Sequence, residues 1–76
     1  MNEESKQLVT VLGSTGSIGV STLAVVRENR NVRIYALTAN RDIGTLLEQC
    51  LEFMPEYAVL VDPVAAEEFS KRLKRV

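Results

Sequence analysis

Three glycines spaced three residues apart form the segment of this 76-residue chain whose residue types could do chemistry. Gly13, Gly16 and Gly19 lie between a short apolar run and a segment with helical periodicity. A glycine turn before a helix can place backbone amides and the positive end of the helix dipole against a phosphate. In this interpretation Gly13 allows a sharp turn, Gly16 lets the phosphate approach the backbone, and Gly19 lets the helix pack closely against the strand.

Hydroxyl side chains in the same turn, Ser14, Thr15 and Ser17, add donors that suit phosphate oxygens. The spacing is G-x-x-G-x-x-G and not the commoner G-x-G-x-x-G, so a tight turn without a ligand remains an alternative. A mononucleotide P-loop is disfavoured, because Val20 follows Gly19 where that motif requires Lys. The position of the turn between a strand and a helix therefore favours a dinucleotide.

The end of the second apolar run indicates which dinucleotide would bind. NAD-binding domains commonly place an acidic residue there to hold the ribose hydroxyls. Here the run ends in Ala39-Asn40-Arg41, with no acid before the turn. Arg41 could pair with a ribose 2′-phosphate through its planar guanidinium, which favours NADP over NAD. An exposed loop arginine is the alternative, and the next residue, Asp42, either caps the following helix or weakens phosphate binding.

Six elements are predicted to position these residues. The apolar runs 8–12, 32–39 and 57–61 are short and rich in branched residues, which is typical of buried strands. Helical spacing follows each run, over about 18–30 and 43–54 and then from Pro63, which Asp62 precedes as an N-cap. This order predicts an α/β fold, a Rossmann-like βαβαβα half-domain. Its three parallel strands should lie in the order 3-2-1, with helices on both faces.

Apolar stripes predict the helix faces that pack on the sheet. The stripe of the first helix consists of Ile18, Thr22, Leu23, Val25 and Val26. The second has Ile43, Leu46, Leu47, Cys50, Leu51 and Met54, with Glu48, Gln49 and Glu52 on the other side, and the third has Ala66, Phe69, Leu73 and Val76. Cys50 is accordingly interpreted as a small core residue and not as a nucleophile.

Composition and charge exclude several classes of function. The chain has no histidine and one cysteine, so it has no Ser-His triad, no histidine-ligated metal site and no intramolecular disulfide. A net charge of −1 is a poor footprint for nucleic acid, and no pair of carboxylates suggests acid/base catalysis. The polar residues 1–7 lack the features of a secretory signal, and the apolar runs are too short for a membrane. We expect a frayed tail over residues 1–6 and a cytoplasmic location.

Two blocks of sequence carry a resemblance more specific than the glycine turn. The first is QLVTVLGSTGSIG at 7–19, followed by STL and VVR, and the second is EQCLEF at 48–53, followed by Pro55, Tyr57 and Ala58. From Gln7 to about Val64 the chain resembles the amino terminus of the 1-deoxy-D-xylulose-5-phosphate reductoisomerase family. The resemblance implies an NADPH-dependent enzyme of the non-mevalonate isoprenoid pathway. Such enzymes convert 1-deoxy-D-xylulose 5-phosphate, a small-molecule substrate, to 2-C-methyl-D-erythritol 4-phosphate with Mg²⁺ or Mn²⁺, and a homodimer is expected when intact.

The same resemblance assigns cofactor-binding residues to two segments. Thr15, Gly16, Ser17 and Ile18 match the pyrophosphate-binding turn, and Asn40, Arg41 and Asp42 match the loop for the adenosine ribose phosphate. Asp42 departs from the asparagine expected there. Family members are several times longer, with metal ligands and substrate site beyond Val76.

Residues 1–76 are therefore expected to be the amino-terminal part of an NADP(H)-binding domain, without catalytic or metal-binding residues and inactive alone. The absence of a transit peptide favours a bacterial-type member. Another NADP-dependent Rossmann enzyme, such as an aspartate-semialdehyde dehydrogenase, and a non-catalytic nucleotide-binding module are the alternatives.

Overall fold

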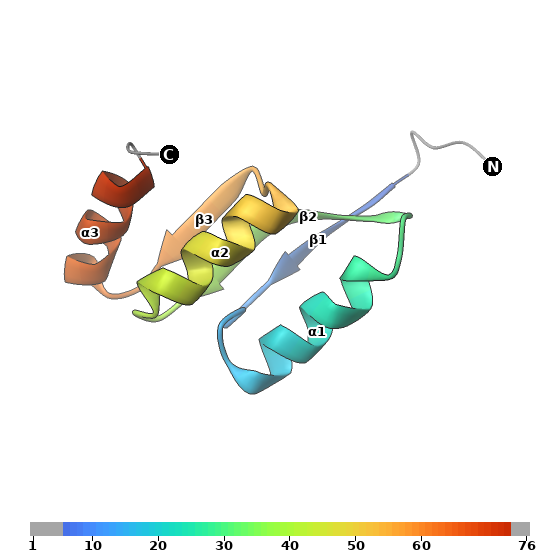
Figure 1. Cartoon of the computed structure of the whole chain (residues 1–76), viewed down its shortest axis with the longest axis horizontal. Helices are drawn as coiled ribbons and strands as arrows, with labels where there is room; N and C mark the ends of the chain where they lie inside the picture. The colour runs from blue at the N-terminus through green and yellow to red at the C-terminus, as the bar shows by residue number, and fades with distance from the viewer. Residues whose placement is uncertain (1–5, 74–76) are drawn as a thin grey trace.

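Strands and helices alternate along the part of the chain, residues 6–73, that the computed structural model describes (Figure 1). The elements are β1 (Gln7–Val11), α1 (Ser17–Arg27), β2 (Val32–Ala39), α2 (Ile43–Phe53), β3 (Tyr57–Leu60) and α3 (Pro63–Leu73). All six predicted elements are present, although α1 ends before the polar residues 28–30 that the prediction includes in it. The predicted tail lies outside the described range apart from Lys6. None of these helices is long and apolar enough to traverse a bilayer.

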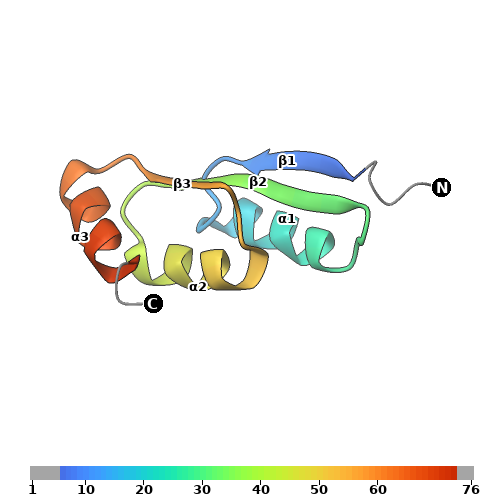
Figure 2. The same cartoon turned by 90° about the horizontal axis from the view of Figure 1, so that it is seen from above.

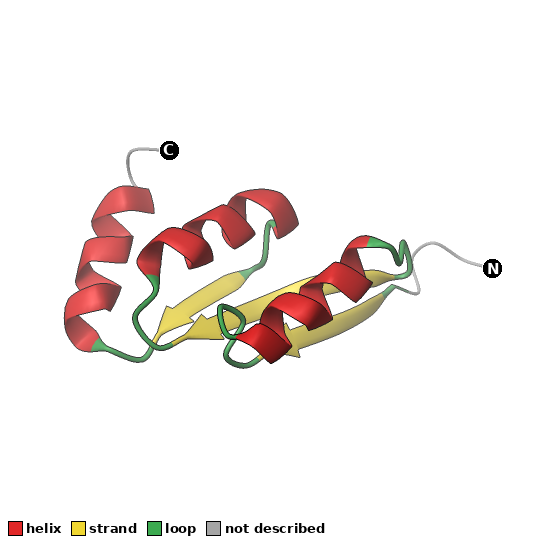
Figure 3. Ribbon diagram, turned by 60° about the horizontal axis from the view of Figure 1, so that its bottom comes forward, coloured by secondary structure: helices red, strands yellow, loops and turns green. Residues whose placement is uncertain are grey.

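The three strands form one parallel sheet with β2 in the centre. The order β1-β2-β3 is the predicted 3-2-1 order read from the other edge. Because the strands run in parallel, the loops that follow them emerge at one edge of the sheet (Figure 3). The glycine turn after β1 and the Asn40–Asp42 loop after β2 therefore share the carboxyl edge of the sheet.

A bulge in β2 changes which of its residues face the core. Val9 of β1 pairs with Ile34, but the next residue, Thr10, pairs with Ala36, so that Tyr35 is an extra residue. The extra residue shifts the alternation of side chains by one position. Ile34 and Leu37, which are three residues apart, therefore both belong to the hydrophobic core.

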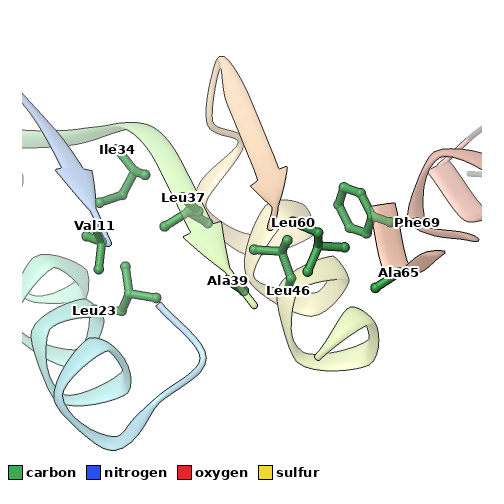
Figure 4. Close-up of a cluster of buried hydrophobic side chains, with 9 residues drawn as sticks. All are labelled: Val11, Leu23, Ile34, Leu37, Ala39, Leu46, Leu60, Ala65 and Phe69. Carbon is green, nitrogen blue, oxygen red and sulfur yellow. The ribbon is translucent and has the colours of Figure 1, made fainter. Parts of the chain in front are cut away.

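The core lies between the sheet and helices on one of its faces. Figure 2 shows α1 and α2 on the same side of the strands. Leu23 of α1 packs in one cluster with Val11, Ile34 and Leu37, and the cluster continues through Leu46 of α2 (Figure 4). Its remaining members are Ala39 and Leu60, at the ends of β2 and β3, and Ala65 and Phe69 of α3.

The prediction that helices cover both faces of the sheet is wrong for residues 6–73, whose helices lie on one side of the strands (Figure 2). The opposite face carries exposed apolar side chains, of which Tyr35 and Tyr57 stack edge to face with ring centroids 5.4 Å apart.

Each helix packs on the core with part of its predicted stripe. The stripe residues that pack there are Leu23, Val26, Ile43, Leu46, Leu47, Cys50, Ala66 and Phe69. In α1, Ile18 and Val25 are exposed, while Gly19 and Leu23 are buried. In α2, Leu51 and Met54 are exposed and Gln49, predicted on the solvent side, is buried. In α3 the buried residues are Ala65 and Phe69, with Ala66 partly buried and Leu73 exposed; Val76 lies outside the described range. Apolar residues occupy more than one side of α1 and α2, so their spacing alone does not select the face that meets the sheet.

The helix ends follow the sequence signals. Asp42 and Asp62 each accept a hydrogen bond from the amide three residues later, which confirms Asp62 as the N-cap before Pro63. Met54 ends α2 in the left-handed conformation, directly before Pro55.

An ion pair joins the far ends of α1 and α2. Arg27 donates from Nε and Nη2 to the carboxylate of Glu52. Its guanidinium also lies 5.4 Å from the ring centroid of Phe53. The hydrogen bonds from Arg27 hold the pKa of Glu52 below its ordinary value, and the same bonds raise the pKa of Arg27.

Candidate functional site

The glycine turn is bound directly to the end of β2. The amide of Ser14 donates to the carbonyl of Thr38 over 2.8 Å, and the amide of Gly13 donates to the hydroxyl of Thr38 over 3.1 Å. Thr38 is followed within two residues by Asn40, where the second candidate segment begins. The two groups of predicted site residues are therefore held side by side at the carboxyl edge.

The structure requires glycine at two of the three glycine positions of the turn, for different physical reasons. Gly13 has a φ of 65°, which is a left-handed conformation that favours glycine. At Gly19 a Cβ atom would lie 2.3 Å from the carbonyl oxygen of Gly13 and 2.6 Å from the Cα of Ser14, so no side chain fits. At Gly16, by contrast, a Cβ would meet only the Gly13 oxygen, at an ordinary 3.5 Å. Close packing at Gly19 is observed, but its contact is the backbone of the turn at Gly13 and Ser14 and not the strand that was predicted.

The start of α1 leaves backbone donors without an intrahelical acceptor. The first helical hydrogen bond runs from the amide of Val20 to the carbonyl of Gly16, so the amides of Ser17, Ile18 and Gly19 precede the bonded part of the helix. Gly16 at the N-cap supplies no side-chain acceptor for them. Ser17 and Ile18 are exposed, and Thr15 is half-buried beside them. These donors and the helix dipole together favour an anion at this position.

Ser14 does not contribute a free hydroxyl to the turn. Its side chain is fully buried, and its Oγ donates to Oε1 of Gln49 over 2.7 Å. The interpretation of Ser14 as a phosphate donor is therefore wrong, because the hydroxyl is already engaged inside the protein. Thr15 and Ser17 remain as the hydroxyl candidates.

The loop after β2 exposes Asn40, Arg41 and Asp42, and the side chain of Asp42 is directed at the start of α2. The carboxylate of Asp42 accepts from the amide of Thr45 over 3.1 Å and so caps α2. Of its two alternatives, capping is the one that the structure shows. The loop backbone is also anchored, since the carbonyl of Asn40 accepts from the amide of Asp62 over 3.0 Å. Arg41 is thus an exposed cation on an anchored backbone, at the same edge of the sheet as the glycine turn.

Two other features lie away from this edge. A cavity of about 650 Å³ opens at the opposite end of the sheet, between the end of α1 and the start of β2, and contains none of the predicted site residues. Cys50 is half-buried on α2, and burial raises the pKa of its thiol, which agrees with a packing role. Within residues 6–73, no three His, Cys, Asp or Glu side chains are grouped so that they could hold a metal ion.

Thr38 and Gln49 are the residues of this region that sequence reasoning misses. The pattern marks Thr38 only as part of a strand and places Gln49 on the solvent face of its helix. For Gln49 a signal exists, since its position is one turn from both Leu46 and Phe53, on the side of the helix that contacts the sheet.

Comparisons with known proteins agree on one family. The family model for 1-deoxy-D-xylulose 5-phosphate reductoisomerase matches residues 9–76. The proteins of that name from Nitrosococcus oceani and Nitrosospira multiformis are 51% and 53% identical to this chain, over 69 and 68 residues. These alignments cover 90% and 88% of this chain, but 18% and 17% of those proteins.

A solved structure shows the same fold. A crystal structure of DOX-P reductoisomerase in complex with magnesium matches with a TM-score of 0.83 at 36% sequence identity. The match covers 92% of this chain and 18% of that one, so this chain spans less than a fifth of the relatives it matches.

Proposed function

The chain belongs to the 1-deoxy-D-xylulose 5-phosphate reductoisomerase family, and from this premise we propose that it binds NADPH as part of a longer reductoisomerase. The proposed reaction is conversion of 1-deoxy-D-xylulose 5-phosphate to 2-C-methyl-D-erythritol 4-phosphate, with a divalent metal. The names of the relatives support the reaction, and the magnesium in the similar crystal structure supports the metal. We also propose a cytoplasmic homodimer without nucleic-acid or membrane partners.

Gly16 is the single observation that carries the cofactor proposal. The fold requires glycine at Gly13 for its backbone angle and at Gly19 for its contacts, but neither reason applies to Gly16. Its φ of −78° is open to any residue, and a Cβ there would meet no close contact. Gly16 directly precedes the exposed amides of α1, so a side chain would compete with a diphosphate for the space beside them.

In this proposal the diphosphate of NADPH accepts from the amides of Ser17 and Ile18 and from the hydroxyls of Thr15 and Ser17. Arg41 pairs with the 2′-phosphate, with Asn40 as a further donor. Asp42 holds the loop by capping α2. NADPH would supply a hydride, and the residues of this chain only bind and orient it.

The metal and the catalytic groups are not assigned to residues 6–73, where no metal-ligating cluster exists. We propose that the 76-residue chain alone binds NADPH weakly and does not turn over substrate. One phosphate turn and one ribose loop must offset the lost freedom of a flexible ligand.

The test is an NMR titration of the chain with NADPH, which measures weak affinities and identifies the amides that move. We expect shifts at residues 15–18 and 40–42. Gly16→Ala should lower the free energy of unfolding by no more than about 1 kcal/mol, because alanine is a poorer N-cap than glycine. It should weaken NADPH binding about tenfold or more, the loss expected when a charged group loses its close contacts. The matched control is Gly44→Ala, near the start of α2, where a Cβ would meet nothing within 4 Å. Equal NADPH affinity in wild type and Gly16→Ala would contradict the proposal.

A further inference from the structure

Gln49 is a polar residue in the middle of a helix, yet only 8% of it is exposed. Its side-chain amide makes two hydrogen bonds to one residue of the glycine turn. Oε1 accepts from the hydroxyl of Ser14 over 2.7 Å, and Nε2 donates to the carbonyl of Ser14 over 2.9 Å. Ser14 and Gln49 are the two buried polar residues of the range 6–73, and they satisfy each other.

These bonds fix the backbone on which α1 rests. The amide of Ser14 is held by the carbonyl of Thr38, and its own carbonyl is held by Gln49. The same backbone lies directly under Gly19, too close for a Cβ atom. A displacement of Ser14 would therefore move the first turn of α1, together with the exposed amides of Ser17 and Ile18.

We propose that Gln49 is a positioning residue of the cofactor site, which couples the diphosphate turn to the 2′-phosphate loop. This inference rests on the proposed function, in which both segments bind NADPH. The coupling runs through α2, which carries Gln49 in its second turn and follows Asp42 and Arg41 at its capped start. One helix thus holds the turn at one point and presents the loop at another.

A simple packing role would give a different result from a positioning role. If Gln49 only filled space, an apolar side chain of similar size would serve, as replacement of buried polar groups often shows. Gln49→Leu keeps the volume but removes both hydrogen bonds, and leaves the carbonyl of Ser14 without its partner. Ser14→Ala removes only the hydroxyl and keeps the bond from Gln49 to the carbonyl.

The experiment compares these variants with Leu47→Ala, a control on the same helix that packs against the core. Three quantities are measured: the NADPH dissociation constant, the hydrogen-exchange rate of the Ser14 amide and the chemical shifts of the amides at 15–19. Gln49→Leu should weaken binding about tenfold and speed exchange of the Ser14 amide. Ser14→Ala and Leu47→Ala should stay within about twofold of the wild-type affinity.

The proposal is overturned if Gln49→Leu folds and its NADPH affinity and turn-amide shifts are unchanged. It is also overturned if Leu47→Ala loses as much NADPH affinity as Gln49→Leu. If Gln49→Leu does not fold, the double variant Ser14→Ala/Gln49→Leu, which lacks the unpaired hydroxyl, is measured instead of Gln49→Leu. If wild type does not bind NADPH but Gln49→Leu still alters the turn amides, the proposed function fails. The positioning of the turn by Gln49 is then supported.

Discussion

A single methyl group added at Gly19 tests how closely α1 packs on the glycine turn. The new Cβ would lie 2.3 Å from the Gly13 oxygen and 2.7 Å from the carbonyl carbon of Ser14. To reach even 3.0 Å, the oxygen would have to retreat by 0.7 Å (3.0 minus 2.3). These neighbours are backbone atoms, anchored to Thr38 and Gln49, and cannot turn away as a flexible side chain would.

The expected cost outweighs the gain in helix propensity. Overpacking a fixed site costs about 1–3 kcal/mol, and a disturbed hydrogen bond of the turn adds about 1 kcal/mol. Replacement of glycine by alanine in a helix returns at most about 1 kcal/mol. Gly19→Ala should therefore lower the free energy of unfolding by about 1–3 kcal/mol.

Urea unfolding followed by circular dichroism measures this difference, with Gly44→Ala as the matched control. Gly44 is the second residue of α2, and a Cβ added there would meet no atom within 4 Å. Alanine at this position should therefore stabilise the chain by about 0.4–1 kcal/mol. The same substitution near the start of two helices should thus act with opposite sign. If Gly19→Ala unfolds within about 0.5 kcal/mol of wild type, the close packing of α1 on the turn is refuted.

Three further predictions concern side chains around the site. Asp42→Ala should lower the free energy of unfolding by about 1 kcal/mol in the same urea assay, because the amide of Thr45 loses its acceptor. Arg41→Glu should reduce the ratio of NADPH to NADH affinity in NMR titrations. An unchanged ratio would contradict the proposed pairing of Arg41 with the 2′-phosphate. The pKa of Glu52, measured by NMR, should lie below its ordinary 4.5 and return toward it in Arg27→Gln. Since the folded pKa is lowered, the ion pair stabilises the fold above the ordinary pKa and ceases to do so as pH falls through the folded value.

The strand order and the position of the site could be predicted from the sequence. Each strand is a short apolar run, and the helical segments between them are long enough for right-handed crossovers. The Rossmann precedent for such units then gives the order 3-2-1, which is the order observed. The glycine turn and Arg41 both follow strands, so parallel pairing places them at one edge. The left-handed glycine, Gly13, was also predictable, because a strand that turns directly into a helix needs an unusual backbone angle.

Which residues of each helix and strand face the core was less predictable from the sequence than the strand order. The bulge at Tyr35 comes from pairing with β1, and no residue within β2 announces it. Period-two alternation alone would place Ile34 and Leu37 on opposite faces, but both are in the core. The prediction places Ile18 and Leu51 in the core for a related reason, since hydrophobicity does not record which side of a helix its neighbours occupy.

Gln49 shows where such errors concentrate. Binary patterning assigns polar residues to the solvent side of a helix, so it places Gln49 there although its position faces the sheet. The physical alternative is that a buried polar side chain has found complete partners, which here are the hydroxyl and the carbonyl of Ser14. Such a pair contributes little to stability compared with apolar packing, but it fixes one geometry of the turn. A polar residue that interrupts an otherwise apolar face beside a glycine turn therefore indicates a positioned backbone, and this is where local patterning is expected to fail.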